Sequence, residues 1–270
     1  MMQTEDYNYL YALEEDFWWF AGMRDITSVL LDPVCPPLQS RLILDAGCGT
    51  GGMLTWLKRY AGEGKVVGID LVHTAVEFCR ERDHKYLAQA SVTHLPFADS
   101  VFDLLTSFDV LVQLPGKSSD ERALREMLRV LRPGGIAFVR AAAYDWMYSD
   151  HDQALGTQRR YRLDALVDKM ESAGFKILRA TYANTLLLPV AVLRRLVLKR
   201  IGLAGSGSDV KPLSSHLQWL NRALTGVLRS EAWWLKHPQL NLRAGLSLVC
   251  VAQKPHGCDT VPLLQSAQPV

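Results

Sequence analysis

A glycine-rich turn between an apolar segment and a helical segment constrains this chain more than any other feature. The turn, with its flanking residues, reads Asp45-Ala-Gly-Cys-Gly-Thr-Gly-Gly52. Glycines let a backbone turn sharply and approach a ligand where any Cβ would collide. The helix expected at 53–60 directs its free N–H groups to the same place. The sequence therefore predicts a ligand site on a strand–turn–helix unit.

Apolar strands alternate with helical patterns through the middle of the chain. We expect strands at 41–45, 65–70, 86–90, 102–107, 136–140, 175–181 and 246–253. Between them we expect helices at 53–60, 74–82, 120–131 and 163–173, and a turn at 132–135. This alternation is typical of a parallel sheet with crossover helices. It predicts an α/β fold with a doubly wound, mostly parallel, seven-stranded sheet.

Five segments follow from the changes of composition along the chain. They are an N-terminal helical lid at 1–38, a ligand-binding core at 39–184, a helical cap at 185–242, the last core strand at 243–256 and a tail at 257–270, expected to be disordered.

The composition of the 270 residues, 49% hydrophobic with a net charge of +2, excludes disorder as the dominant state. The near-neutral charge gives no reason to expect a nucleic-acid partner. Five scattered cysteines suggest neither a disulfide framework nor a metal site. The acidic N-terminus is unlike a signal peptide, and no apolar run is long enough to span a membrane, so we expect a cytoplasmic protein.

Two carboxylates indicate which ligand the turn binds. Asp70 ends the next strand, 19 residues after Gly51, where it can accept two hydroxyls of a ribose. The glycines also match the dinucleotide pattern G-x-G-x-x-G, so an NAD-dependent oxidoreductase is an alternative. However, Asp45 would repel a pyrophosphate, whereas it could hold an ammonium group. A ligand with an ammonium group, a ribose and no phosphate is S-adenosylmethionine.

The chain resembles the class I S-adenosylmethionine-dependent methyltransferases. The matching pieces are Leu44-Asp-Ala-Gly-Cys-Gly-Thr-Gly51, Gly68-Ile-Asp70, Leu95-Pro-Phe97 with Phe102-Asp103, and Leu131-Arg-Pro-Gly-Gly135. The resemblance implies the following cofactor contacts: Asp45, Gly47, Gly49 and Gly51 at the methionine moiety, Asp70 and Leu71 at the ribose, Ser91 and Val92 at the adenine, and Phe108 near the donor methyl. Ser91 replaces an Asp of many relatives. Gln113 replaces a His that acts as a base in some of them.

Further pieces are similar to a bacterial subgroup associated with cell-surface glycan or natural-product genes. They are Glu15-Asp-Phe-Trp-Trp-Phe20 with Arg24, His151-Asp152 with Arg159-Arg-Tyr161, and Glu231 with Gly245-Leu-Ser247. The four aromatic residues at 17–20 predict either an apolar plug between arm and core or a lid that touches the substrate. The substrate contacts expected from these pieces and from the core are Tyr11, Trp19, Arg24, Gln113, Arg159 and Arg160.

The loop after the strand at 136–140 is expected to bring catalytic groups to the carboxyl edge of the sheet. His151 is the predicted base, with Tyr161 and Glu15 positioning the acceptor. Paired arginines at 159–160 suit a phosphate or carboxylate of the acceptor. Alternatively, the arginines pair with Asp152 or Asp164, and His151 caps a turn.

The segment 189–201 combines an apolar stripe with four bases. Three interpretations remain open: a peripheral membrane contact, a cap packed on the core, or a roof over an acceptor pocket made apolar by Trp219, Trp233 and Trp234.

The sequence as a whole predicts methyl transfer from S-adenosylmethionine to a small or medium-sized, partly apolar acceptor, such as a natural-product intermediate or a lipid- or phosphate-bearing metabolite. O-methylation is favoured, and C-methylation of a prenyl or aromatic acceptor is the alternative. A cofactor-binding partner subunit without activity is a further alternative, since no base is certain. We expect no metal cofactor.

Overall fold

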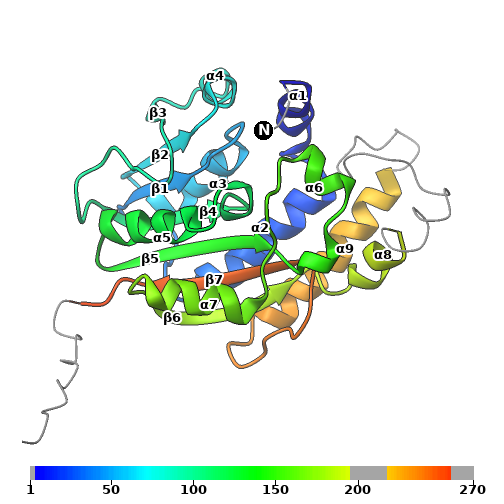
Figure 1. Ribbon diagram of the computed structural model, residues 1–270. Helices are drawn as coiled ribbons and strands as arrows, with labels where there is room; N and C mark the ends of the chain where they lie inside the picture. The colour runs from blue at the N-terminus through cyan, green and yellow to red at the C-terminus, as the bar shows by residue number, and fades with distance from the viewer. Residues whose placement is uncertain (1–3, 195–217, 257–270) are drawn as a thin grey trace, which may run out of the picture.

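The computed structural model describes residues 4–194 and 218–256, which form a seven-stranded sheet in the order β3-β2-β1-β4-β5-β7-β6 (Figure 1). β7 is antiparallel to both neighbours, and the other neighbouring pairs are parallel. This confirms the predicted doubly wound α/β class. The strands are β1 Leu42–Ala46, β2 Lys65–Asp70, β3 Leu87–Gln89, β4 Phe102–Phe108, β5 Leu131–Ala142, β6 Lys176–Ala183 and β7 Ser247–Gln253.

Helices cover both faces of the sheet. They are α1 Thr4–Leu13, α2 Trp18–Leu31, α3 Gly52–Ala61, α4 His73–Glu81, α5 Ser119–Val130, α6 Asp150–Ala154, α7 Leu163–Ser172, α8 Leu188–Val192 and α9 Gln218–Leu235. Apolar side chains of α2, α3 and α9 pack on one face in a cluster with β1, β4, β5 and β7. Side chains of α5 and α7 pack on the other face. Two short 3₁₀ turns, η1 Leu111–Gln113 and η2 Asp145–Met147, lie in the loops after β4 and β5.

The prediction of a turn at 132–135 is wrong, because these residues belong to β5. The backbone N–H of Gly134 donates to Lys254 O, and Lys254 N–H donates to Gly135 O, so the segment pairs with the chain leaving β7. The register between β4 and β5 shifts between Phe102 and Leu104. A bulge therefore accommodates the proline and glycines without ending the strand.

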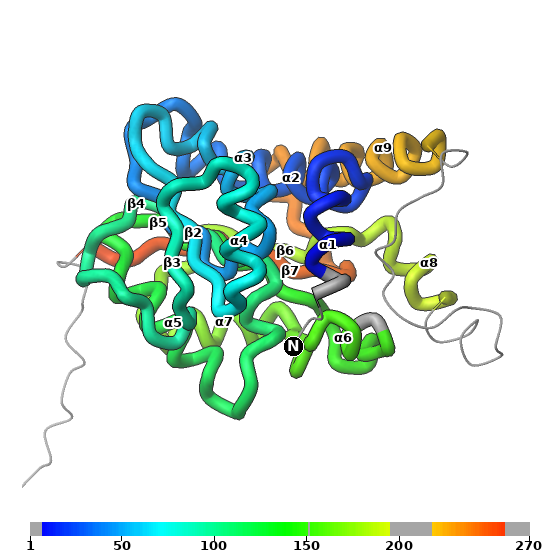
Figure 2. Tube along the Cα trace, turned by 90° about the horizontal axis from the view of Figure 1, so that it is seen from above, coloured from blue at the N-terminus to red at the C-terminus, as the bar shows by residue number. Residues whose placement is uncertain are grey.

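The N-terminal arm is fastened to the cap by the close packing of α2 on α9, which lie side by side (Figure 2). A Cβ on Gly22 would lie 2.4 Å from Leu228 Cβ, so only glycine allows this approach. The Asn221 side chain accepts a hydrogen bond from Trp18 N–H at 2.8 Å and thereby caps the start of α2. Two segments far apart in sequence thus form one unit above the sheet.

Several predicted segments lie outside the described residues. A basic helix is predicted at 189–201, but α8 ends at Val192, and residues from 195 onward in this helix are not described. The predicted tail at 257–270 is also outside the described residues. Within the described part of the chain, no helix has the length and apolar character needed to cross a bilayer.

Gly22→Ala and Gly226→Ala are expected to change stability in opposite directions, although both replace a helical glycine. Nothing lies within 4 Å of a Cβ at Gly226, so alanine there should raise the free energy of unfolding by about 0.5–1 kcal/mol. Gly22→Ala should lower it by about 1–3 kcal/mol, because Leu228 must move. Urea unfolding of both variants measures the difference. Stabilisation by Gly22→Ala would show that α2 and α9 are not in close contact.

Candidate active site

A cavity of about 1350 Å³ runs along the carboxyl edge of the sheet, under the N-terminal arm and the first residues of the cap. Residues at the ends of β1, β2, β4, β5 and β6 line it, together with Ser247 at the start of β7. Because β7 is antiparallel, its first residue lies at the same edge as the ends of the other strands. This edge is where open α/β sheets bind ligands.

The glycine turn forms the floor of the cavity beside β1. Gly47 has a φ of +93°, and a Cβ there would lie 2.2 Å from Val110 Cγ2, so no other residue fits. The backbone N–H groups of Gly47 and Cys48 both donate to Ile69 O, which fixes the turn to β2. Gly47 and Gly49, predicted to contact the cofactor, line the cavity. Gly51 does not; its φ of +89° serves instead to begin α3.

The carboxylate of Asp45 is buried at the cavity wall with one oxygen unpartnered. Its Oδ1 accepts a hydrogen bond from Thr106 Oγ1 at 2.6 Å, whereas Oδ2 has no partner among the described residues. Burial raises the pKa of Asp45 to about 7, the Thr106 hydrogen bond opposing it. An unpartnered buried carboxylate beside a cavity is a site for a cationic group of a ligand.

Asp70 lies at the end of β2 and also faces the cavity. Its Oδ1 accepts from Val72 N–H at 2.9 Å and its Oδ2 from Gly49 N–H at 3.0 Å. Each carboxylate oxygen can accept a second hydrogen bond, so Asp70 can still bind two hydroxyls. Leu71, Ser91 and Val92, predicted to contact the ribose and the adenine, also line the cavity.

The arm closes this side of the cavity through Glu14. Its Oε2 accepts hydrogen bonds from Thr50 Oγ1 at 2.6 Å and from Gly52 N–H at 2.8 Å, at the N-terminus of α3. Burial raises the pKa of Glu14, and these hydrogen bonds oppose that effect. Arg82 donates to Thr50 O and to Tyr11 O, and so ties the same stretch of arm to the turn.

The cavity continues beyond β1; we call the part beside β4 to β6 the acceptor half and the part beside β1 and β2 the cofactor half. Five residues of the arm line the acceptor half: Phe17, Trp18, Trp19, Phe20 and Met23. At its floor, Arg140 pairs with Asp109 at 2.8 Å, and its guanidinium lies 4.7 Å from the centre of the Trp19 ring. Gln113, predicted to contact the substrate, and Phe108, predicted to lie near the donor methyl, both line the cavity.

Comparison with known proteins decides the family. Residues 44–139 match the family model of a methyltransferase domain. A malonyl-[acyl-carrier protein] O-methyltransferase of Pectobacterium atrosepticum is 36% identical over 175 residues, 60% of this chain and 66% of that protein. The methyltransferase GfsG of Streptomyces halstedii is 35% identical over 100 residues, 34% of either chain. The chain belongs to the class I S-adenosylmethionine-dependent methyltransferases.

The fold of the methyltransferase agrees with that family. The crystal structure of an S-adenosylmethionine-dependent methyltransferase from Thermotoga maritima matches with a TM-score of 0.56 at 16% identity, over 93% of this chain and 95% of that one. The alignments span only about a third of GfsG and about two thirds of the O-methyltransferase.

The cofactor half fits S-adenosylmethionine, the cofactor of this family. The unpartnered Asp45 oxygen suits the ammonium group of its methionine moiety, and Asp70 suits the ribose. The close approach of the backbone at Gly47 leaves room for the ligand where a side chain would fill it.

Three predicted residues of the arm do not line the cavity. Glu15 is exposed and pairs with Arg82 at 2.6 Å, so it is wrongly placed as a catalytic residue. The Tyr11 ring packs at an angle of 33° on Phe78 of α4, with centroids 5.0 Å apart. The Arg24 guanidinium donates to the carbonyls of residues 14 and 15, and thus holds the bend between α1 and α2. The residue that reaches the cofactor half is Glu14, which the sequence analysis missed.

Tyr161 and Arg159 are also wrongly placed as contacts of the acceptor. The Tyr161 hydroxyl is buried and donates to Asp120 Oδ2 at 2.8 Å, and Arg159 pairs with the same carboxylate at 3.2 Å. Both therefore brace α5 from outside the cavity. Arg160 does line the cavity, where its Nε donates to Asp152 at 2.7 Å, the pairing expected as the alternative. The side chain of His151 lies outside what the structure describes, so its role stays a prediction.

The interpretation that three tryptophans form a roof over the cavity is wrong, since Trp219, Trp233 and Trp234 are exposed and do not line it. Leu187, Val190 and Ala191, around α8, border the acceptor half instead.

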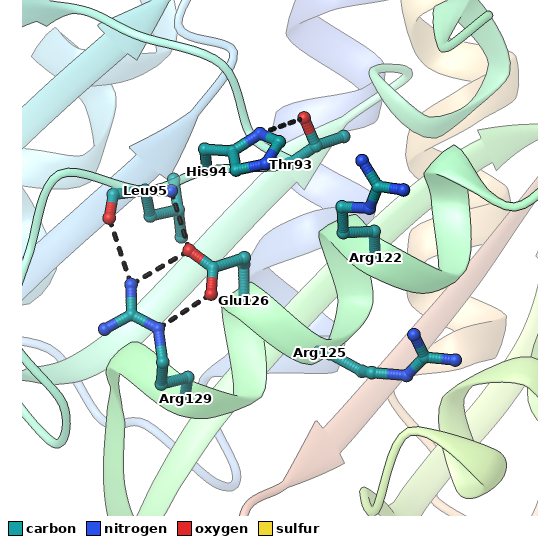
Figure 3. A pocket seen from close by; sticks show the side chains of 7 residues that line it. All are labelled: Thr93, His94, Leu95, Arg122, Arg125, Glu126 and Arg129. Atoms are coloured by element: carbon teal, nitrogen blue, oxygen red, sulfur yellow. Dashed lines mark hydrogen bonds and ion pairs between the residues drawn. The ribbon is translucent and has the colours of Figure 1, made fainter. Parts of the chain in front are cut away.

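A second, shallower hollow lies on the outer face of α5 (Figure 3). Glu126 accepts from Leu95 N–H at 2.7 Å and pairs with Arg129, which also donates to Leu95 O. These contacts hold the predicted Leu95-Pro-Phe97 loop on α5. The hollow is therefore explained by structural ion pairs, and the larger cavity is the candidate active site.

Glu14→Ala and Glu15→Ala are expected to differ in their effects, because Glu14 holds the arm on the glycine turn and Glu15 is exposed. Glu14→Ala removes the cap of α3 and should lower the free energy of unfolding by about 1–2 kcal/mol and weaken binding of S-adenosylhomocysteine. Glu15→Ala removes an exposed ion pair and should cost less than about 1 kcal/mol, with unchanged binding. Urea unfolding and calorimetric titration measure both. Equal effects of the two variants would contradict the assignment to Glu14.

Proposed function

We propose that this methyltransferase transfers a methyl group from S-adenosylmethionine to an oxygen of a small or medium-sized, partly apolar acceptor. The observation that carries the proposal is one continuous cavity with two chemically different halves. Its volume of about 1350 Å³ exceeds the range of roughly 300–1,000 Å³ that is usual for a site holding one ligand. The cavity is therefore large enough for cofactor and acceptor together.

In the cofactor half, the polar groups match the polar groups of the cofactor in order along the sheet edge. Asp45 on β1 holds the ammonium group, and Asp70 on β2 holds the ribose hydroxyls. Ser91 and Val92, after β3, border the adenine. Bound S-adenosylmethionine supplies a methyl group on a sulfonium, which reacts with a nucleophile once the two are aligned. Phe108, at the end of β4, separates this half from the acceptor half.

In the acceptor half, the chain orients the acceptor and excludes water. The aromatic side chains at 17–20 supply apolar surface, and the arm closes over it. The two carboxylates with described contacts there, Asp109 and Asp152, are each engaged by an arginine. Neither is therefore a free proton acceptor, which favours an acceptor whose oxygen is already acidic, such as a phenol, an enol or a carboxylic acid.

Calorimetric titration with S-adenosylhomocysteine, with NAD as the control, tests the proposal. Micromolar binding of S-adenosylhomocysteine and no binding of NAD are expected. Transfer of labelled methyl groups to phenolic or carboxylic acceptors then tests the reaction. Binding of NAD alone would favour the oxidoreductase. Cofactor binding without transfer to any acceptor would favour a partner subunit.

Binding of S-adenosylhomocysteine is expected to release a proton from Asp45. Its pKa of about 7 means that Asp45 is mostly protonated in the free protein below pH 7, and a ligand ammonium favours the carboxylate. Affinity should therefore rise with pH, by at most about tenfold per unit, and level off above pH 7. In the free protein the same raised pKa lowers the free energy of unfolding as the pH rises towards 7.

Calorimetry in two buffers of different ionisation enthalpy measures this proton release. Asp45→Asn keeps the shape of the side chain and should abolish both the release and the pH dependence below 7. A pH-independent affinity of the unaltered protein between pH 5.5 and 7 would contradict the role of Asp45.

A further inference from the structure

Two polar side chains at the far end of the acceptor half form no side-chain hydrogen bond with the part of the chain that the structure describes. Asn184 follows β6 and Ser247 begins β7, and both line the cavity. They are 3% and 6% exposed. The Asn184 Oδ1 has no hydrogen-bond partner among the described residues, and no described residue bonds to the Ser247 hydroxyl. Buried polar atoms are normally hydrogen-bonded, so the unpartnered Asn184 Oδ1, with the Ser247 hydroxyl on the same cavity wall, points to a ligand.

The backbone holds Asn184 firmly in this position. Asn184 has a φ of +61°, a left-handed conformation that is uncommon outside glycine. Its carbonyl accepts from Leu246 N–H at 3.3 Å. The Glu231 carboxylate, from α9, accepts from the next two N–H groups, those of Thr185 and Leu186. Because its backbone is fixed from two sides, Asn184 holds its side chain at one place on the cavity wall.

The surroundings of the pair are mostly apolar. Leu187, Val190 and Ala191 from the start of the cap line the cavity beside it, and Leu246 precedes Ser247. An unsatisfied amide in such surroundings costs free energy, which a hydrogen bond to a ligand recovers. The nearest lining residues beside the pair are thus mostly apolar, with Arg194 the charged residue of the same stretch.

The pair lies on the side of β5 away from the cofactor half. Ser247 is opposite Ala142 on β5, two residues beyond Arg140 and so about 7 Å further along the strand. Arg140 is in turn opposite Phe108 on β4. With the donor methyl near Phe108, the pair contacts the end of the acceptor that is not methylated.

We propose that Asn184 and Ser247 bind a hydroxyl group of the acceptor, at the end remote from the methylated oxygen. The inference rests on the proposed function for the identity of the acceptor half. A hydroxyl both donates and accepts, so it can donate to Asn184 Oδ1 and accept from the Ser247 hydroxyl. Sites built to hydrogen-bond a hydroxyl reject an analogue without it more strongly than apolar pockets reject a change of size. The pair therefore determines specificity.

The probes are 1-hexanol, whose hydroxyl can donate a hydrogen bond, and 1-fluorohexane, which has no donor. Each is titrated, by ligand-observed NMR, into the full chain loaded with S-adenosylhomocysteine. The unaltered protein is expected to bind the alcohol about tenfold more tightly than the fluoride. Asn184→Gly, which keeps the positive φ, and Ser247→Ala should each reduce this ratio towards one while leaving the fluoride affinity unchanged.

Ser107→Ala is the matched control, because the Ser107 hydroxyl is also buried and unpartnered but does not line the cavity. It should leave the ratio unchanged. Equal affinities for the two probes in the unaltered protein, or a preference that survives in both variants, would overturn the proposal. Failure to bind S-adenosylhomocysteine would instead contradict the proposed function, and the ratio is then measured on the ligand-free chain, so that the two failures are distinguishable.

Discussion

The closed cavity depends on one carboxylate, that of Glu14, placed on the first turn of α3. The glycine turn after β1 leaves the N–H of Gly52 without a helical partner, and Glu14 satisfies it from the N-terminal arm. The same contact therefore completes a helix and brings the arm over the cofactor half. Once the arm is fixed there, α2 continues over the acceptor half, and Asn221 of α9 caps its start. The free N–H of Gly52 thus helps to determine where the N-terminal arm lies.

The two halves of the cavity use buried charge differently. In the cofactor half, Asp45 keeps an unpartnered oxygen and a raised pKa, a costly arrangement without a ligand. In the acceptor half, Arg140 and Arg160 each have a carboxylate partner and are neutralised within the protein. Among the described residues that line the cavity, Asp45 is thus the carboxylate with an oxygen recorded as buried and unpartnered. Elsewhere the cavity recognises its ligand by shape, apolar surface and neutral hydrogen bonds.

The cofactor half was largely predictable from the sequence, and the acceptor half was not. Asp45, Gly47 and Asp70 are fixed by strand ends and a turn, so a local pattern specifies where they lie. Glu14 and Glu15 are neighbours of the same type, and only the bend held by Arg24 decides which of them reaches the turn. Tyr161 lies at the expected edge, yet Asp120 of α5 draws its hydroxyl away from the cavity. Such choices depend on helices packed from distant parts of the chain.

The position of Asn184 in the cavity wall could not be predicted from the sequence. Its left-handed backbone is common for asparagine in turns, so the sequence alone does not distinguish it from an ordinary turn residue. What distinguishes it is Glu231, 47 residues later, whose carboxylate holds the N–H groups that follow it. Glu231 lies on α9, the helix that also packs against α2 across Gly22. One helix of the cap therefore contacts both the N-terminal arm, at Gly22, and the segment after β6, through Glu231.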